Sequence, residues 1–270
     1  MCAPRIVRVA HEQALARLTR RGLFAAAGVV ALGSAATSAA VSAESVVDLT
    51  HTLTPELPVW PGNPPLLAAP VARHELGGFA QQSLILWEHT GTHIDAPLHR
   101  VPGGASVDRI PAADLVAPLV VLDISARADT DADAMVTVAD VEAFEDRHGR
   151  IPERAFVAMF SGWERRLATP GAFVNLDPGG TPHAPGFHAT TANHLVRERN
   201  IVGLGVDTLS LDRAADREYG VHTAVLGAGR YGVEMLARLD TVPPIGASVV
   251  IGAPTHAGGT GGPCRVLALV

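Results

Sequence analysis

Short apolar runs alternate with amphipathic segments along most of the chain. The runs at 118–124, 155–160 and 201–207 are almost continuously apolar, which predicts strands buried on both faces. Two further runs, 247–253 and 265–270, predict strands near the end of the chain. Strands that alternate with helices indicate one α/β domain.

Two segments between these runs have the period of a helix. Segment 137–149 places three apolar residues on one face, begins with a threonine that can cap it and ends with a glycine that can stop it. Segment 190–200 predicts a second helix, and the Pro- and Gly-rich stretch 170–185 predicts a surface loop. Neither a repeat nor a low-complexity linker divides the chain after residue 43, which favours a single domain.

The first 43 residues have a different pattern. A basic stretch reaches the twin arginine Arg20-Arg21, an uncharged run of small and apolar residues follows, and "VSA" precedes Glu44. These features predict a twin-arginine signal peptide, residues 1–43, and a secreted or extracytoplasmic mature domain, 44–270. A retained membrane anchor is the alternative. The run is dominated by Ala, Gly and Ser, which favours cleavage and therefore no membrane contact in the mature form.

The charge and the cysteines of the mature part exclude some functions. The signal removes five of the 21 basic and one of the 27 acidic residues, which leaves 16 against 26, a net charge of about −10. An acidic domain without a Lys/Arg cluster argues against nucleic acid as a partner. Only Cys264 remains after cleavage, so an internal disulfide and a cysteine-based zinc site are excluded.

The segment "HTGTHIDAPLHR" concentrates candidate chemistry in twelve residues. In an extended chain His89, His93, Asp95 and His99 face one side, whereas a helix would turn Asp95 about 200° from His93. A straight strand would also separate His89 from Asp95 by about 20 Å, too far for one ion. The chain must therefore bend, and a glycine at 91 and a proline at 97 permit this.

Imidazole nitrogens and a carboxylate are ligands of Zn²⁺ and also of Mn²⁺ or Fe²⁺. Two histidines and one aspartate would leave a position for water, which is typical of a catalytic site, and an aspartate can bridge two ions. The alternative is a solvated polar loop. Three histidines and an aspartate in this pattern favour the metal site.

These residues also carry a resemblance. The string from His89 to His99 matches the signature H-x-G-T-H-x-D-x-P-x-H, and the chain resembles the cyclase family of metal-dependent hydrolases, which includes bacterial kynurenine formamidase, isatin hydrolase and a dienelactone hydrolase. Four further segments are similar to the family in the same order: "DLTHTLTPELPVWPGNPP", "FSGWERR", "GLGVDTLSLD" and "GGTGGPCRVLAL".

The resemblance implies a fold and roles for particular residues. The fold is a swivelling β/β/α domain, an α/β protein with a central mixed β core flanked by helices. His89, His93 and Asp95 would hold a first metal ion. Asp95 would also share a second ion with His222 and Glu234, which lie twelve residues apart. His99 would act as a general acid/base rather than as a ligand, and the cofactor would be one or two Zn²⁺ per chain, with Mn²⁺ as the alternative.

The implied activity is hydrolysis of the C–N or C–O bond of a small aromatic or cyclic amide or ester by metal-activated water. The alternative is a metal-dependent cyclase or dehydratase of secondary metabolism. A non-catalytic binding protein is a third possibility, against which the presence of His99 speaks. By analogy with the family we expect a small-molecule substrate and a homodimer or homotetramer.

For three further residues the sequence allows either a structural role or a role in the site. Trp60 in "VWPG" can line an aromatic-binding pocket or belong to the core. His51 is either a structural residue at a strand end or part of the site, and Asp207 either orients the site or begins a turn. His183, His188 and His194 have no partner in the family pattern and are expected to be surface groups.

Overall fold

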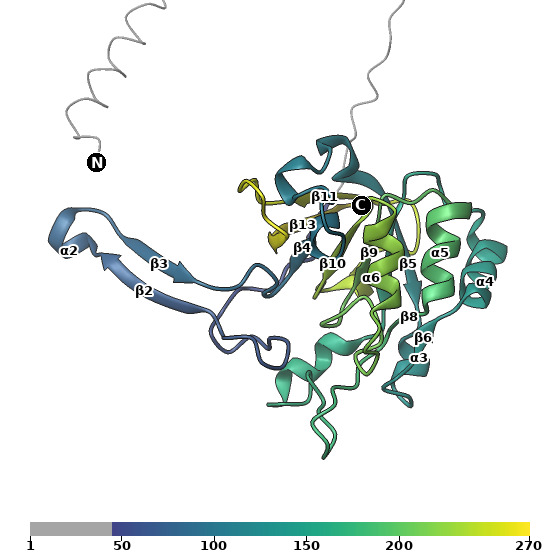
Figure 1. The fold of residues 1–270 in the computed structure, drawn as a ribbon, viewed down its shortest axis with the longest axis horizontal. Helices are drawn as coiled ribbons and strands as arrows, with labels where there is room; N and C mark the ends of the chain where they lie inside the picture. The colour runs from purple at the N-terminus through teal and green to yellow at the C-terminus, as the bar shows by residue number, and fades with distance from the viewer. Residues whose placement is uncertain (1–44) are drawn as a thin grey trace, which may run out of the picture. The chain divides into compact units, whose positions relative to one another are not determined.

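A nine-stranded mixed sheet forms the centre of residues 45–270, the part of the chain that the computed structural model describes (Figure 1). The predicted signal peptide lies outside the described residues, so that prediction stays a prediction. The strand order is β1-β13-β11-β5-β7-β9-β10-β4-β12. The bounds of these strands are β1 Val46–Asp48, β4 His93–Asp95, β5 Val116–Asp123, β7 Phe156–Phe160, β9 Gly203–Val206, β10 Tyr231–Glu234, β11 Ser248–Gly252, β12 Gly261–Pro263 and β13 Arg265–Leu269.

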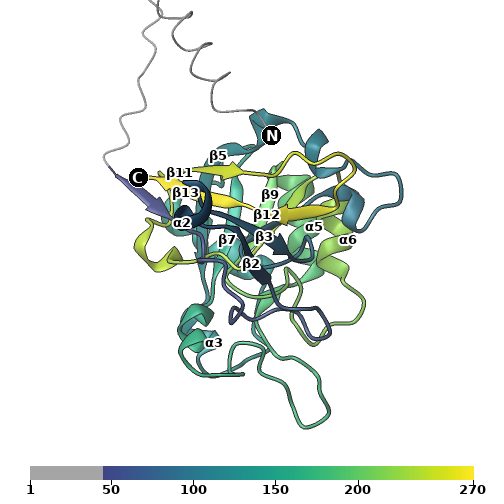
Figure 2. The same ribbon diagram turned by 90° about the vertical axis from the view of Figure 1, so that its left-hand side faces the viewer.

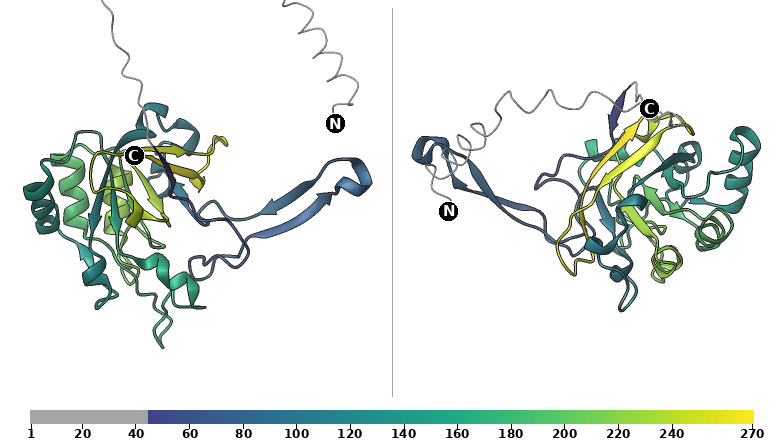
Figure 3. Two further views of the ribbon diagram at one scale, coloured as in Figure 1. Left: turned by 180° about the vertical axis from the view of Figure 1, so that it is seen from behind. Right: turned by 90° about the horizontal axis from the view of Figure 1, so that it is seen from above.

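The four central strands β5, β7, β9 and β10 are parallel, and the strands on either side of them pair antiparallel. Three of these parallel strands, β5, β7 and β9, are those that the sequence predicts from almost continuously apolar runs, because strands covered on both faces need apolar residues at every position, whereas β10 was not predicted. Ribbon views from behind and from above show helices on one face and the late strands on the other (Figure 3). The predicted α/β fold with a mixed core is confirmed.

The helices are α3 Ser125–Ala128, α4 Val138–His148, α5 Ala189–Glu198 and α6 Gly220–Gly227, with short 3-10 turns η1 Pro97–His99, η2 Val107–Arg109, η3 Ala112–Asp114, η4 Trp163–Ala168 and η5 Leu239–Thr241. Helix α4 begins at the predicted cap: Thr137 and Asp140 form a capping box, and Gly149 ends the helix at φ 85°. Within residues 45–270, no helix is long and apolar enough to cross a membrane.

Two apolar cores lie on opposite faces of the sheet. Alternate residues of β5 and β7 point to different faces, so Val120 and Val157 pack under the helices, whereas Leu119 and Phe156 pack against the antiparallel strands. The centre of the sheet is therefore buried on both faces.

A two-stranded arm projects from the body. Strand β2 Leu67–Ala72 pairs with β3 Gln81–Ile85, and the short helix α2 His74–Gly77 closes the tip (Figure 1). Strands β6 Met135–Val136 and β8 Gly186–Phe187 form another small pair. The view along the arm shows it in front of β12 and β7, and no strand of the main sheet pairs with it within residues 45–270 (Figure 2).

Candidate metal centre

Strand β4 places the signature residues against two neighbouring strands. It pairs antiparallel with β10 and β12, so Glu234 lies directly across from His93, and Gly232 lies across from Asp95. The bends predicted on either side of the strand are present: Gly91 has φ 66°, and Pro97 begins the turn η1. Because η1 follows at once, His99 returns toward the strand it leaves.

Four buried side chains meet above β4. His93 Nε2 lies 3.4 Å from Asp95 Oδ1 and 3.4 Å from Glu234 Oε2. His222 Nε2 lies 3.4 Å from Asp95 Oδ2 and 3.2 Å from Glu234 Oε1. Two imidazole nitrogens and two carboxylates therefore converge at distances too long for strong hydrogen bonds and suitable for a cation between them.

The other nitrogen of each of these histidines is fixed by a hydrogen bond. His93 Nδ1 donates to the carbonyl of Gly91 at 2.7 Å, and His222 Nδ1 donates to Asp212 Oδ2 at 2.6 Å. Asp212 also accepts the backbone N–H groups of Val221 and His222 at the start of α6. Each Nε2 is thereby left with its lone pair toward the cluster, the arrangement typical of histidines that bind metal.

The charges at this site fit a divalent cation. Within residues 45–270, His93 Nε2 and Asp95 Oδ2 are buried without a hydrogen-bond partner. Burial would lower the pKa of His93, but the carboxylates of Asp95 and Glu234, each 3.4 Å from Nε2, outweigh burial and raise the pKa to about 10. Two buried carboxylates thus draw a proton onto His93 when nothing else neutralises them, and a metal ion can take the place of that proton.

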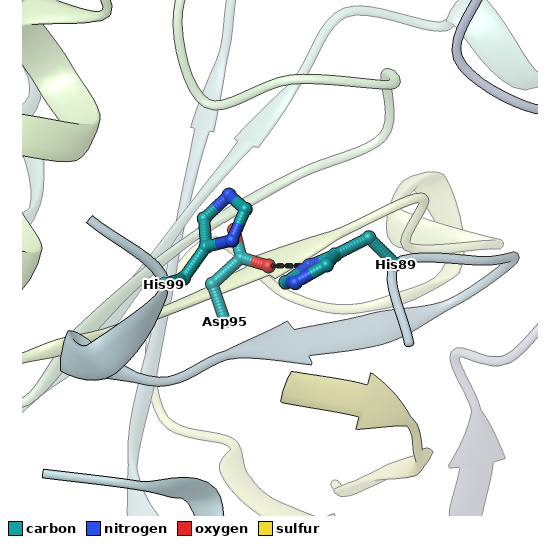
Figure 4. A group of neighbouring side chains, drawn as sticks. All are labelled: His89, Asp95 and His99. Atoms are coloured by element: carbon teal, nitrogen blue, oxygen red, sulfur yellow. Dashed lines mark hydrogen bonds and ion pairs between the residues drawn. The ribbon is translucent and has the colours of Figure 1, made fainter. Parts of the chain in front are cut away.

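His89 and His99 extend the cluster toward solvent. Their rings lie 3.9 Å apart between centroids, and His89 Nδ1 lies 2.6 Å from Asp95 Oδ1 (Figure 4). One ligand atom from each of His89, Asp95 and His99 lies within 4.8 Å of the others, as is true of His93, Asp95 and Glu234. Asp95 belongs to both groups, so it is placed to bridge two ions. By distance alone His99 can also serve as a ligand.

A second carboxylate orients His89. Its Nε2 lies 3.0 Å from Thr260 Oγ1, and Thr260 donates its hydroxyl to Glu88, which His256 also contacts. Because Thr260 uses its proton on Glu88, it accepts from His89 Nε2, and Nδ1 is the nitrogen that faces Asp95. The roles of Glu88, Thr260 and Asp212 were not predicted from the sequence. The signal for Asp212 was the second aspartate of "GVDTLSLD", five residues after Asp207.

Glycines on both neighbouring strands give the carboxylate of Asp95 its room. A Cβ on Gly232 would lie 2.6 Å from Leu211 Cδ1 and 3.4 Å from Asp95 Oδ2. A Cβ on Gly261 would lie 2.3 Å from the carbonyl oxygen of Ile94 and 2.8 Å from His89 Cε1. Any side chain at these positions would displace the residues around Asp95.

The cluster lies in a cavity of about 430 Å³, a volume typical of sites for small molecules. Its wall is mainly apolar and aromatic, and the lining residues outside the cluster are Pro58, Val59, Trp60, Asn63, Trp87, Gly91, Arg100, Leu209, Ser210, Tyr219 and Met235. Trp60 lines this cavity and also packs against the buried cluster of Trp163 and Phe173, so its substrate contact stays a prediction. Partial burial lowers the pKa of His99, which favours its neutral form at neutral pH.

The remaining candidates lie outside the cavity. Asp207 accepts hydrogen bonds from Ser161 and from the backbone of Trp163, and burial raises its pKa to about 6, so it holds the turn after β7. His51 donates its backbone N–H to Thr92, and its ring is partly buried. His183 contacts Asp133 at the surface, and His188 caps α5.

Comparisons with known proteins agree with this geometry. The family model described as putative cyclase matches residues 47–213. Isatin hydrolase of Roseibium aggregatum is 32% identical over 243 residues, covering 83% of this chain and 91% of the relative. Kynurenine formamidase of Salinibacter ruber is 27% identical over 226 residues, with 83% and 96% covered.

Solved structures are similar over the same part of the chain. Isatin hydrolase A from Labrenzia aggregata, bound to benzyl benzoate, has a TM-score of 0.78 at 37% identity and covers 84% of this chain and 93% of its own. An isatin hydrolase bound to the product analogue thioisatinate has a TM-score of 0.78 at 31% identity, with 83% and 92% covered.

The fold and the histidine–carboxylate cluster, with relatives that are hydrolases, define the class of metal-dependent hydrolases. Within that class, this chain belongs to the cyclase family. The resemblance inferred from the signature is confirmed.

Proposed function

We propose that the protein hydrolyses the C–N or C–O bond of a small aromatic or cyclic amide or ester. The observation that carries this proposal is the buried cluster of His93, Asp95, His222 and Glu234 at the wall of an aromatic cavity. The names of the relatives support the substrate class, because isatin is a cyclic amide and formylkynurenine an aromatic formamide.

His89, His93 and Asp95 would hold one metal ion, and Asp95, His222 and Glu234 a second. When bound, Zn²⁺ or Mn²⁺ activates water and polarises a carbonyl. The ligand set of imidazole and carboxylate suits both metals. We propose one or two Zn²⁺ per chain, with Mn²⁺ as the alternative.

The protein's own groups provide the remaining chemistry. His99, exposed toward the cavity and lying against His89, can take a proton from water and give it to the leaving nitrogen or oxygen. Trp60 and Trp87 offer flat surfaces that hold an aromatic ring and exclude water from it. The hydrogen bond from His222 to Asp212 holds the imidazole in one orientation while the substrate is converted to product.

Metal analysis and a substrate panel test this proposal together. Purified protein should contain one to two equivalents of Zn²⁺ or Mn²⁺, and it should hydrolyse at least one of isatin, N-formylkynurenine and simple lactones. Removal of the metal with a chelator should abolish turnover, and the added metal should restore it. Full activity without metal contradicts the mechanism, whereas loaded protein inactive on the whole panel points to the cyclase or dehydratase reaction.

We also propose that the protein forms a homodimer through the β2–β3 arm. Apolar side chains on both faces of the arm are half or more exposed, with Leu76 at 87%, Ile85 at 65% and Val71 at 60%. A two-stranded ribbon is marginally stable alone in water, and exposed apolar surface of this kind marks an interface. A second copy presents the same surface, so one twofold contact covers both arms.

Light scattering on purified protein tests the dimer. Wild type should have twice the mass of one chain, and the double substitution Leu76→Glu with Ile85→Glu should shift it to one chain without loss of the folded core. A monomeric wild type contradicts the proposal, as does a double variant that remains dimeric.

A further inference from the structure

Arg100 brings a guanidinium group to the wall of the candidate active site. It directly follows His99 and lines the same cavity, and of the lining residues, all within 45–270, it is the only Lys or Arg. Its Cζ lies 5.4 Å from the centroid of the Tyr219 ring, and that centroid lies 6.0 Å from the centroid of the His222 ring. Tyr219 therefore spans the interval between Arg100 and the metal cluster.

The guanidinium is held in place by neutral acceptors. Its Nη2 donates to the carbonyl of Glu218 at 3.0 Å, and its Nε donates to the hydroxyl of Thr223 at 3.3 Å. Arginine has five N–H donors, so these bonds leave both donors of Nη1 and one of Nη2. Nη1 and Nη2 can therefore still bind a carboxylate together through two parallel hydrogen bonds.

Five other arginines of the described region are paired with carboxylates. Arg127 contacts Asp140, and Arg199 contacts Glu145. Within residues 45–270, no carboxylate lies within ion-pair distance of Arg100, and both of its hydrogen-bond acceptors are uncharged. The charge of Arg100 is therefore available to a ligand, and two anchoring bonds reduce the entropy that the side chain would lose on binding.

The surroundings restrict what that ligand can be. The negative groups of the cavity, Asp95 and Glu234, are occupied by His93, His222 and the proposed metal. The other walls are aromatic or apolar, including Trp60 and Trp87. A molecule that fits has a reactive carbonyl at the cluster, a ring in the middle and an anion at Arg100.

We propose that Arg100 binds a carboxylate of the substrate, so that the preferred substrates are aromatic or cyclic amides or esters that carry a carboxylate besides the bond to be cleaved. This inference rests on the proposed hydrolase function for the identity of the reacting bond. It adds a specificity-determining residue that the metal ligands do not provide, because Arg100 recognises a part of the substrate that does not react.

Two ketones test the inference without turnover. The probes 3-acetylbenzoate and acetophenone share an aromatic ring and a carbonyl, have no bond to hydrolyse and differ by one carboxylate. Calorimetric titration of zinc-loaded protein should show 3-acetylbenzoate binding about tenfold or more tightly, since hydrogen bonds between charged groups are the strong ones. In Arg100→Met the ratio of the two affinities should fall by about tenfold.

Matched variants separate recognition from general charge and from misfolding. Arg217→Met removes the same charge from the loop before α6 at an exposed residue outside the cavity lining, so its affinity ratio should stay that of wild type. Arg100→Lys keeps the charge without the fork and should give an intermediate ratio, which keeps the test valid if the methionine variant is unstable.

Two results would overturn the inference: no preference for 3-acetylbenzoate in wild type, or a preference that survives in Arg100→Met because the metal holds the carboxylate. The outcome is separate from that of the hydrolysis panel. A panel without turnover, combined with an affinity ratio that depends on Arg100, removes the hydrolase proposal and leaves the carboxylate site. Turnover on the panel, combined with an affinity ratio that is the same in wild type and Arg100→Met, supports the hydrolase proposal and removes the carboxylate site.

Discussion

Replacement of Asp212 by Asn tests how the site orients its ligands. Asp212 Oδ2 accepts from His222 Nδ1 at 2.6 Å, and Oδ1 accepts from the backbone of Val221 at 2.7 Å. Asparagine keeps one acceptor and places an NH₂ group at the other position. If the NH₂ group faces Val221, the start of α6 loses its acceptor. If it faces His222, Nδ1 becomes the acceptor and the proton moves to Nε2, so the imidazole no longer presents a lone pair to the cluster.

The expected loss can be estimated from these contacts. Removing the partner that orients a metal-binding histidine typically lowers metal affinity about 10–100-fold, which corresponds to about 1.4–2.8 kcal/mol. The buried hydrogen bond to the start of α6 adds about 1–3 kcal/mol to the cost in folding free energy of the metal-free protein. Metal affinity and metal-free stability should therefore both fall in Asp212→Asn.

Competition between the protein and a chromophoric chelator for Zn²⁺ measures the affinity, and urea unfolding of the metal-free protein measures the stability. Asp216→Asn is the matched control, because Asp216 lies on the same loop and its side chain accepts from the exposed backbone N–H of Glu218. The reasoning is refuted if Asp212→Asn retains wild-type zinc affinity, or if Asp216→Asn loses as much.

Three further predictions address the other parts of the site. His99→Ala should lower kcat by about 10²–10⁴-fold with nearly unchanged metal content, measured by turnover and metal analysis; loss of the metal would make His99 a ligand. Gly261→Ala should cost about 1–3 kcal/mol of unfolding free energy, because its Cβ meets Ile94 and His89, whereas Gly227→Ala, with open space, should be neutral in the same urea titration. Asp207 has a pKa of about 6 in the folded state, above the unfolded value of about 3.9, so between these pH values the folded state binds more protons than the unfolded state. The free energy of unfolding should therefore fall by up to about 3 kcal/mol as the pH rises from about 4 to 6. Asp207→Asn should lack that part of the loss when unfolding is followed against pH, and equal pH dependence in both proteins would contradict the assignment.

The sequence predicts the centre of the fold well, because local signals and tertiary burial agree there. The apolar run at 118–124 lies within β5 apart from its last residue, and Thr137 and Gly149 bound α4 as expected. The short strands around the site were not predicted. Gly261–Pro263 forms β12 against strand propensity, and its pairing with β4 is imposed by residues far away in the chain.

In the site too, the features set by local sequence were predicted, and the contacts that orient the histidines, which form only in the folded chain, were not. The signature predicts the bend at Gly91 and the turn at Pro97, and the structure brings His222 and Glu234 to Asp95. Which groups orient the histidines could not be read from spacing, since Asp212 and Thr260 contact them only after the sheet has formed. The arm was not predicted either. Its two strands pair only with each other and have no buried face, so their sequence lacks the alternation of apolar and polar residues that indicates a strand.

The position of β4 between β10 and β12 has a consequence for biosynthesis. The strand that carries His93 and Asp95 is made early, but β12 and Thr260 are within the last eleven residues of the chain. A nascent chain therefore holds one edge of β4 unpaired until β12 has been made, although β10 can pair with the other edge earlier, and metal capture at the complete site has to wait for β12. Shortening the chain before β12 should leave a protein that cannot mature, even though every proposed metal ligand is present.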